Sequence, residues 1–388
     1  MTRRPQARAT AALMLMLGLL ACTQVAVKPE PGPDSIGPVA LAIASAPPPE
    51  DLQLDVGVRV FDSRSENRLG VPVNEGTFAR IRDLETHYLP VVLRNTLVES
   101  NQWGVVRVLP QDDPSVDLLV EGTIIDSNGA HLTLKVRAMD SSGRQWLDDT
   151  YTGRAHAIHY PDVMPGDQLR ASEVMKDPFQ DLHSQIANDL LLARMGLAPQ
   201  ALRNLREVSA LKHARDLSPE AFGAMLTTDA DGHLALERLP AANDPMLSRV
   251  QSMLERHHTF IDTVDSYYEA LYLDVKTLYD LWRHYSNDQI TAEAQEQEQR
   301  RTHNSGYSSD SFGALRSAYN RYKWAKIFEQ EFVGLASGFV SETAPAILEL
   351  SERVNGLTGS VEEQYAQWRT LLRAIYEIET GGVLPQRP

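Results

Sequence analysis

The hydrophobic pattern becomes regular at Leu52. From Leu52 to Val60 every second residue is apolar, and polar or small residues lie between them. This period of two is typical of a strand with one buried face. A polar loop follows, and apolar residues then recur at helical spacing, which predicts a helix over residues 77–104. Pro90 lies inside it, so we expect a kink there or two abutting helices.

Four short strands are predicted after this helix, over residues 105–109, 118–125, 130–139 and 145–151. The turns Asp126–Gly129 and Asp140–Gly143 connect the later ones, and each turn ends in a glycine that suits a hairpin. Strand, helix and then an antiparallel meander predict a compact α/β sandwich with a helix packed on one face of the sheet.

Helical spacing replaces the strand pattern after residue 160. Asp177 is a good N-cap with Pro178 at the first helical position, and this helix is expected to end near Gly196. A second helix is expected to run to about Arg215, and a short third one to begin around Pro219.

The longest regular pattern begins at Asp244. Apolar and aromatic residues recur every three or four positions up to Tyr285, which predicts a long helix over about 244–300 with a polar, fraying end. A second long helix is expected over about 311–355, and a last one presents Tyr365 to Ile378. The predicted fold class is therefore α+β: a small α/β sandwich with an antiparallel meander, followed by a mainly helical, elongated antiparallel bundle.

The N-terminus has the layout of a secretory signal. Three arginines at positions 3, 4 and 8 precede Ala11–Ala21, which carries no charge. This apolar run has about 11 residues, whereas a membrane-spanning helix needs roughly 20. A permanent transmembrane span is therefore not expected here.

The sequence Leu19-Leu20-Ala21-Cys22 ends this run and resembles the lipobox of bacterial lipoproteins. The resemblance implies cleavage before Cys22 and attachment of lipid to its sulfur. Thr23 stands where an aspartate would favour inner-membrane retention, so the resemblance implies the outer membrane, with the body facing the periplasm. Two or more acyl chains hold a protein stably on a bilayer. Cys22 is thus expected to be the lipidation site and the anchor.

The cysteine count and the net charge agree with a lipid anchor at Cys22. Cys22 is the one cysteine of 388 residues, so no disulfide is expected. Removal of residues 1–21 takes away three arginines and no acid, which changes the formal net charge from −15 to −18. An acidic body is a poor partner for nucleic acid and is repelled by anionic lipid, so membrane contact should be confined to the anchor.

Four segments follow from these patterns: a signal peptide over 1–21, a Pro-rich tether over 22–50, an α/β domain over 51–160 and a helical domain over 161–388. The tether is either extended or disordered. The α/β domain is similar in pattern to the small domains of curli-secretion-type lipoproteins and of lipoprotein activators of peptidoglycan synthases. No functional residue is transferred from that resemblance.

One candidate site lies on the first long helix. His257 occupies the apolar seam beside His258, with Asp262, Asp265 and the pair Tyr267 and Tyr268 further along. We interpret His257 as a hydrogen-bonded histidine among core aromatics, because metal ligands usually occur in spaced sets and no HxxxH or HExxH pattern exists. A metal or proton-linked cluster is the alternative.

Other motifs fail on their spacing. Asp229, Asp231 and Gly232 match part of an EF-hand loop, but its first position would be Thr227 and its twelfth Arg238, so a turn is expected. His156 and His159 are three residues apart and cannot share a strand face. The serine of Gly334–Gly338 is not at the position of a nucleophile elbow. No catalytic residue, metal ligand or cofactor site is therefore assigned.

These features predict a non-enzymatic lipoprotein of the outer membrane, acting as a scaffold or accessory subunit of an envelope complex. Its helical domain is expected to contact another envelope protein. The rival hypothesis is a glycan-directed envelope hydrolase that uses a carboxylate pair between the two folded parts.

Overall fold

The computed structural model describes residues 35–64, 75–155, 177–241, 244–302, 357 and 359–380. Contacts between Cα atoms divide the chain into Met1–Asp34 and Ser35–Pro388, and all of the described residues belong to the second unit. Cys22, the signal peptide and the predicted helix over 311–355 lie outside the described residues.

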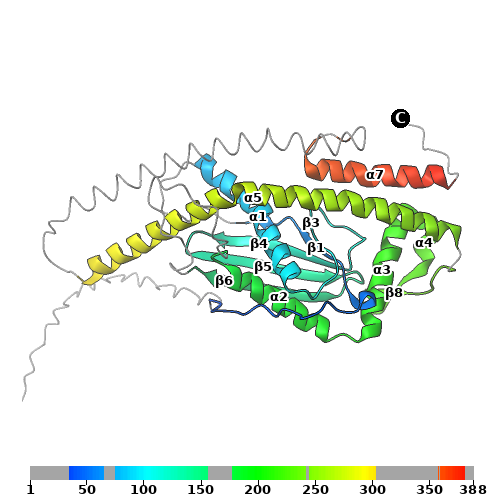
Figure 1. Cartoon of the computed structure of the whole chain (residues 1–388), viewed down its shortest axis with the longest axis horizontal. Coiled ribbons are helices and arrows are strands. Elements are labelled where there is room, and N and C mark those ends of the chain that lie inside the picture. Colours follow the sequence, from blue (N-terminus) through cyan, green and yellow to red (C-terminus); the bar gives the residue numbers. More distant parts are fainter. Residues whose placement is uncertain are drawn as a thin grey trace, which may run out of the picture. The chain divides into compact units, whose positions relative to one another are not determined.

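A mixed sheet forms the centre of the second unit (Figure 1). Its strands lie in the order β3-β1-β4-β5-β6, and β2 pairs with β4. Their bounds are β1 (Val56–Arg59), β2 (Asp62–Ser63), β3 (Val106–Leu109), β4 (Leu118–Ser127), β5 (His131–Asp140) and β6 (Gln145–Arg154). The predicted α+β class and the antiparallel meander β4-β5-β6 are confirmed. The parallel pairing of β1 with both β3 and β4 was not predicted.

One face of the sheet is covered by two helices. Helix α1 (Glu75–Glu99) contacts β1, β2 and β3, and α2 (Gln180–Met195) contacts β6. The fully buried residues of β5 alternate with exposed or half-buried ones, as the period of two predicts. At Gly153 of β6, a Cβ atom would lie 3.1 Å from the Phe179 ring and 3.2 Å from Leu182, so glycine allows α2 to pack closely.

Helix α1 runs through Pro90 as one helix, so of the two alternatives the pair of abutting helices is wrong, and the kink stays a prediction. Proline lacks the N–H that would bond to the carbonyl of Thr86 four residues earlier. The structure uses that carbonyl elsewhere, because the Phe61 N–H donates to it at 2.9 Å. The proline therefore leaves an acceptor that ties α1 to the end of the first strand.

The predicted N-cap of α2 is wrong by two residues: the helix begins at Gln180 with Phe179 as its N-cap, not at Pro178 with Asp177. Asp177 instead accepts the Phe179 N–H on its side chain and the Gln180 N–H on its carbonyl, in the turn that precedes the helix. The predicted starts of the next two helices match the structure closely. Helices α3 (Pro199–Leu217) and α4 (Pro219–Phe222) follow, then a short 3-10 turn η3 (Gly223–Met225) and the hairpin β7 (Leu226–Thr228) and β8 (Leu234–Leu236). A 3-10 turn η1 (Glu50–Leu52) precedes the sheet.

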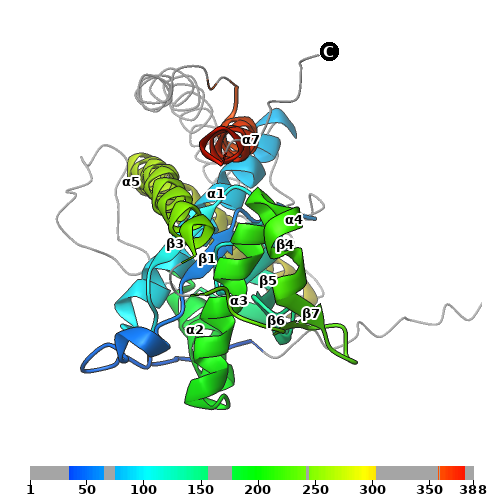
Figure 2. The same cartoon turned by 90° about the vertical axis from the view of Figure 1, so that its right-hand side faces the viewer.

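Helix α5 (Pro245–Thr302) is continuous over 58 residues, about 87 Å at roughly 1.5 Å per residue. It runs beside the edge strand β3, as Figure 2 shows. Helix α7 (Val361–Glu379) packs on its N-terminal half and begins with a capping box between Ser360 and Glu363. The long helix predicted over 244–300 is confirmed.

The described helices after residue 160 pack on the sheet as well as on one another. The predicted boundary at 160 itself lies outside the described residues and stays a prediction. Part of the predicted tether is held by the body: the Ile36 N–H donates to the Thr152 carbonyl at 2.8 Å, and the Ala42 N–H donates to Asn188 at 2.9 Å. A free spacer would therefore end before Ile36.

Candidate functional site

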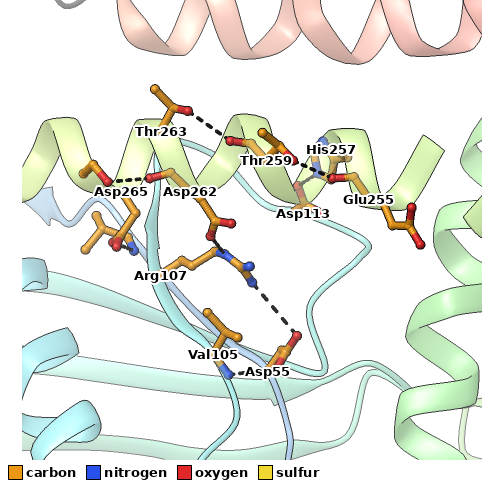
Figure 3. A network of polar contacts seen from close by, with 12 residues as sticks. Asp55, Val105, Arg107, Asp113, Glu255, His257, Thr259, Asp262, Thr263 and Asp265 are labelled. Carbon is orange, nitrogen blue, oxygen red and sulfur yellow. Dashed lines mark hydrogen bonds and ion pairs between the residues drawn. The ribbon is translucent and has the colours of Figure 1, made fainter. Parts of the chain in front are cut away.

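A polar network joins α5 to the edge strand β3 (Figure 3). Edge strands present unpaired backbone groups, and here the Val108 N–H donates to Oδ1 of Asp265 at 2.7 Å. The other oxygen of Asp265 accepts Arg94 from α1 at 2.5 Å. Burial raises the pKa of Asp265, and these two donors oppose the shift. Asp265 therefore satisfies a backbone donor at the sheet edge and links α5 to β3 and α1.

Arg107 makes the second link of this network. Its side chain is 6 % exposed, and its Nε donates to Asp262 of α5 at 2.6 Å. The other end of its guanidinium lies 4.0 Å from Asp55, just before β1 (Figure 3). The sequence placed Asp262 and Asp265 near His257 on the helix. In the structure, both side chains contact the edge strand β3.

His257 lies at the centre of a buried cluster between α5, α7 and the loop before β4. Its Nε2 is 2.5 Å from Oδ2 of Asp113, and Trp368 donates to its Nδ1 at 3.2 Å. Tyr365 donates to the same Asp113 oxygen, and the Ser115 N–H donates to Oδ1. Both ring nitrogens of His257 are engaged, so the prediction of a hydrogen-bonded core histidine is confirmed.

The electrostatics of this cluster keep Asp113 ionised. Burial alone would raise its pKa, but His257, the Ser115 amide and the Tyr365 hydroxyl hold the pKa well below its usual range. His213 of α3 stacks on His257 with ring centroids 5.4 Å apart. Burial, and then His257, lower the pKa of His213 to about 4. His213 is therefore neutral near pH 7.

Two aspartates organise the starts of the three parallel strands. Asp117 accepts the Asp55 N–H at 2.8 Å, and Asp55 accepts the Val105 N–H at 2.9 Å. The second oxygen of Asp117 accepts the Ser209 hydroxyl of α3 at 2.5 Å. Burial raises the pKa of Asp117 to about 6, against the hydrogen bonds from Ser209 and Asp55. A carboxylate pair with a perturbed pKa thus exists, but its described hydrogen bonds are structural.

A third buried node lies further along α5. Arg283 and Glu85 of α1 are 0 % and 1 % exposed, with the ion-pair atoms 3.4 Å apart. Tyr279 and Ser127 each donate to the same Glu85 oxygen at 2.6 Å. Burial raises the pKa of Glu85, while the charge of Arg283 opposes the shift. This node fixes the middle of α5 to α1 and to the end of β4.

The other sequence candidates are dispersed. Asp229 accepts the N–H groups of Asp231 and His233 in the β7–β8 turn, so the predicted turn is confirmed. Ligand atoms of these three residues lie within 4.8 Å of one another, but two of them are exposed surface acids. His156, His159 and Gly334–Gly338 lie outside the described residues.

Sequence reasoning did not identify most of the polar residues that build these networks: Asp55, Glu85, Arg107, Asp113 and Asp117. The available signal was that these charged residues lie within or next to apolar strands and helix faces in the sequence. Tyr268, which was singled out, donates to Glu362 at 3.4 Å and has His87 stacked on it at 5.8 Å.

No protein-family model and no curated protein sequence matches this chain. Among solved structures, a hypothetical protein from Chlamydia trachomatis is 10% identical, over 36% of this chain and 94% of that one, with a TM-score of 0.22. A PelC dodecamer from Paraburkholderia phytofirmans is 12% identical, over 39% and 94%, also with a TM-score of 0.22. Likenesses this weak carry no argument about fold or function. In the described part of the chain, no helix is both long and apolar enough to cross a bilayer.

Proposed function

We propose that this chain is an outer-membrane lipoprotein, anchored through Cys22, whose body faces the periplasm and serves as a non-enzymatic scaffold or accessory subunit. The basic start, the short apolar run and Leu19-Leu20-Ala21-Cys22 support the anchor. The body is consistent with attachment by lipid, since no described helix could span the membrane.

The observation that carries the scaffold proposal is the length of α5 beyond its last contact with the sheet among the described residues. Ser286 accepts the Gly129 N–H at 3.1 Å, and the helix continues to Thr302. Residues 288–302 add about 22 Å at roughly 1.5 Å per residue. Their sequence, DQITAEAQEQEQRRT, is polar on nearly every side. A helix of that composition is suited to solvent or to a polar partner, and we therefore assign it to partner contact.

The buried ionisable groups favour a structural body over a catalytic one. Asp113 accepts three donors, Asp117 bridges two elements, and Glu85 accepts three side chains within hydrogen-bond distance. Catalytic carboxylates need an atom free to reach a substrate. These side chains instead hold α3, α5 and α7 in fixed positions, as a rigid platform requires.

The anchor is tested by Cys22→Ser in a Gram-negative host. Metabolic labelling with a clickable palmitate analogue should label the wild type, and the variant should lose both the label and the membrane fraction. Thr23→Asp is the matched control: it should keep the label and move the protein to the inner membrane. A wild type without label, or one found in the cytosol with its leader intact, contradicts the anchor.

Partner contact is tested with a photo-crosslinking amino acid at Gln295 of α5. In whole cells, irradiation should give one discrete adduct of fixed mass, and Cys22→Ser should abolish it because the body then leaves the membrane. The matched control is the same amino acid at Gln200 of α3, which is exposed and should give no such adduct. Equal adducts from both positions would contradict the assignment of the helix end.

The rival hydrolase is favoured by one observation, the raised pKa of buried Asp117 beside Asp55. The full chain should therefore be assayed on isolated envelope glycan, with Asp117→Asn as the variant. Release of soluble fragments by the wild type and its loss in Asp117→Asn would replace the scaffold proposal. Equal, background-level release from both proteins supports the scaffold.

A further inference from the structure

Buried polar atoms without hydrogen-bond partners gather between α1, the start of α2 and α5. They are the Tyr88 hydroxyl, Oδ2 of Asp177, both ring nitrogens of His183 and Oδ1 of Asp280, each without a partner among the described residues. We name these four residues the Asp177 cluster. A native interior leaves few such atoms, because each one left unsatisfied destabilises the folded state.

Aromatic contacts bring the α1 and α5 members together. The Tyr88 ring lies between two rings of α5, with centroids 4.8 Å from Tyr272 and 4.3 Å from Tyr279. Asp280 follows Tyr279 directly and accepts Lys276 at 2.8 Å. Burial, then the charges of Asp177 and Asp280, raise the pKa of Tyr88, so the Asp280 carboxylate is within electrostatic reach of the Tyr88 hydroxyl.

The α2 members are attached to the same part of α5. Phe179 lies under the guanidinium of Arg283, whose carbon is 4.5 Å from the ring centroid. Asp177 precedes Phe179 by two residues and His183 follows it by one helical turn. Burial and then the charge of Asp177 raise the pKa of Tyr88 well above its usual value, so Asp177 and Tyr88 are within electrostatic reach.

The free atoms of the cluster are mainly acceptors. One oxygen of Asp177 accepts the Phe179 N–H and one oxygen of Asp280 accepts Lys276, which leaves the other oxygen of each carboxylate. Burial lowers the pKa of His183 to about 4, so its imidazole is neutral near pH 7 and offers a lone pair. Asp177 is 7 % exposed and has no ion-pair partner within the described part of the chain. Buried carboxylates normally have a cation beside them.

We infer that the Asp177 cluster binds a divalent cation of the Mg²⁺ type, held partly through water, which ties α5 to α1 and α2. Direct coordination by three side chains is not preformed: in the described residues, the group of acidic and histidine ligands within 4.8 Å of one another is Asp229, Asp231 and His233. Mg²⁺ keeps several waters and takes one or two carboxylates, whereas Ca²⁺ takes six to eight oxygen ligands. This site does not depend on the proposed function.

The site has a route to solvent at its α5 side. The Asp280 and Lys276 side chains are 25% and 23% exposed, while Tyr88 and His183 are buried. A hydrated cation can therefore approach the cluster from the Asp280 side. Bound there, it would join residues from three elements that the sequence separates by almost 200 positions, and this should stabilise the body.

The test uses the full chain purified in detergent and stripped with EDTA. Its melting temperature should rise by several degrees with MgCl₂ and saturate, while NaCl of equal ionic strength should not reproduce the rise. Asp177→Asn should lose most of this response and be at least as stable as the wild type in EDTA, because it removes an unpaired buried charge. Asp229→Asn, the matched control on the surface turn, should respond like the wild type.

Tyr88→Phe keeps the ring and removes only the hydroxyl, so it should weaken Mg²⁺ binding several-fold in titration calorimetry without unfolding the protein. The inference is overturned by a wild type that shows no saturable response, by a response to Ca²⁺ but not to Mg²⁺, or by loss of the response in Asp229→Asn. A cluster filled with water alone would give the first of these results.

Discussion

Trp368 of α7 donates its indole N–H to Nδ1 of His257 on α5, with the two nitrogens 3.2 Å apart. An indole N–H can only donate, so Nδ1 of His257 must carry a lone pair. The ring proton is then on Nε2, and it points to Asp113 at 2.5 Å. The contact thus fixes a neutral tautomer of His257 and aligns a chain of donors from α7 through α5 to the loop before β4.

The first prediction follows from this order of donors. Asp113→Asn keeps the size of the side chain but offers an N–H₂ group to atoms that already donate, namely His257 Nε2 and the Tyr365 hydroxyl. At least one buried donor loses its acceptor, which costs roughly 1–3 kcal/mol for each group left unsatisfied. Chemical denaturation should therefore show a loss of about that size. Asp112→Asn, at the exposed neighbouring position, should change the free energy of unfolding by less than about 0.5 kcal/mol.

The second prediction concerns acid. Burial lowers the pKa of His213 to about 4, and an unfolded histidine titrates near 6.5. Between these values the unfolded chain binds more protons, so this stability is complete above about pH 6.5 and decreases as pH falls through 4. His213→Phe keeps a ring against His257 and removes the titrating group. Its loss of stability between pH 6.5 and 4 should be smaller than that of the wild type by about 1–3 kcal/mol.

The pH series needs a matched histidine. His233→Gln changes a histidine in the β7–β8 turn, outside the His257 cluster, and it should follow the wild-type pH profile. Asp117 acts in the opposite sense, because burial raises its pKa to about 6 and its protonation favours the folded state. The Asp117 contribution is present in all of these proteins, so the difference between His213→Phe and the wild type isolates His213. Parallel profiles for the two proteins would contradict the prediction.

Local patterns predicted the elements well. The alternation in β5 and the three-to-four spacing in α5 each depend on neighbours in sequence, and the structure confirms both. The parallel position of β1 between β3 and β4 depends on contacts between strands 50 or more residues apart, so no local pattern indicates it. Pro90 was expected to interrupt α1, yet a carbonyl left free by proline can find a donor elsewhere, and Phe61 supplies it.

The candidate site was predicted less completely. His257 was recognised from its place in an apolar seam, but Asp113 lies 144 residues away and was not connected with it. The two hairpin glycines show the same limit. Gly143 has φ +90, as its turn requires, whereas the reason for Gly129 is the close approach of α5, which only the folded chain reveals.

The third prediction uses Asp117. Its pKa of about 6 means that burial makes the ionised form unfavourable in the folded state. Asp117→Asn can keep its carbonyl toward the Asp55 N–H and turn its amide toward Ser209, whose hydroxyl can donate to the Arg206 carbonyl at 2.9 Å. At pH 7 the variant should be as stable as the wild type or up to about 2 kcal/mol more stable. This advantage should disappear as pH falls from 6 to 4.

Denaturation in urea at pH 7 and pH 4.5 measures both parts of this prediction. Ser209→Ala is the companion variant: it removes a donor to a buried carboxylate and should destabilise the protein at pH 7 by about 1 kcal/mol. A loss of more than about 2 kcal/mol in Asp117→Asn at pH 7 would mean that the charge of Asp117 is needed in the folded state.

The fourth prediction concerns the close packing of α5 against Gly129 of the sheet hairpin. A Cβ atom on Gly129 would lie 2.2 Å from the Arg283 carbonyl oxygen and 2.2 Å from the Asn287 nitrogen. Both are backbone atoms of a helix, so neither can turn away as a side chain would, and α5 must move. That movement would also disturb the buried pair of Arg283 with Glu85 and the Gly129 hydrogen bond to Ser286. Overpacking in a fixed interior costs about 1–3 kcal/mol, so the free energy of unfolding of Gly129→Ala should fall by about that amount.

Gly223→Ala is the control, because no atom beyond its chain neighbours lies within 4 Å of the added Cβ and its backbone is helical. It should gain about 0.4–1 kcal/mol from a less flexible unfolded chain. Hydrogen exchange should then show faster opening of α5 around residues 283–290 in Gly129→Ala alone. Equal stability of the two variants would mean that α5 is not held at Gly129.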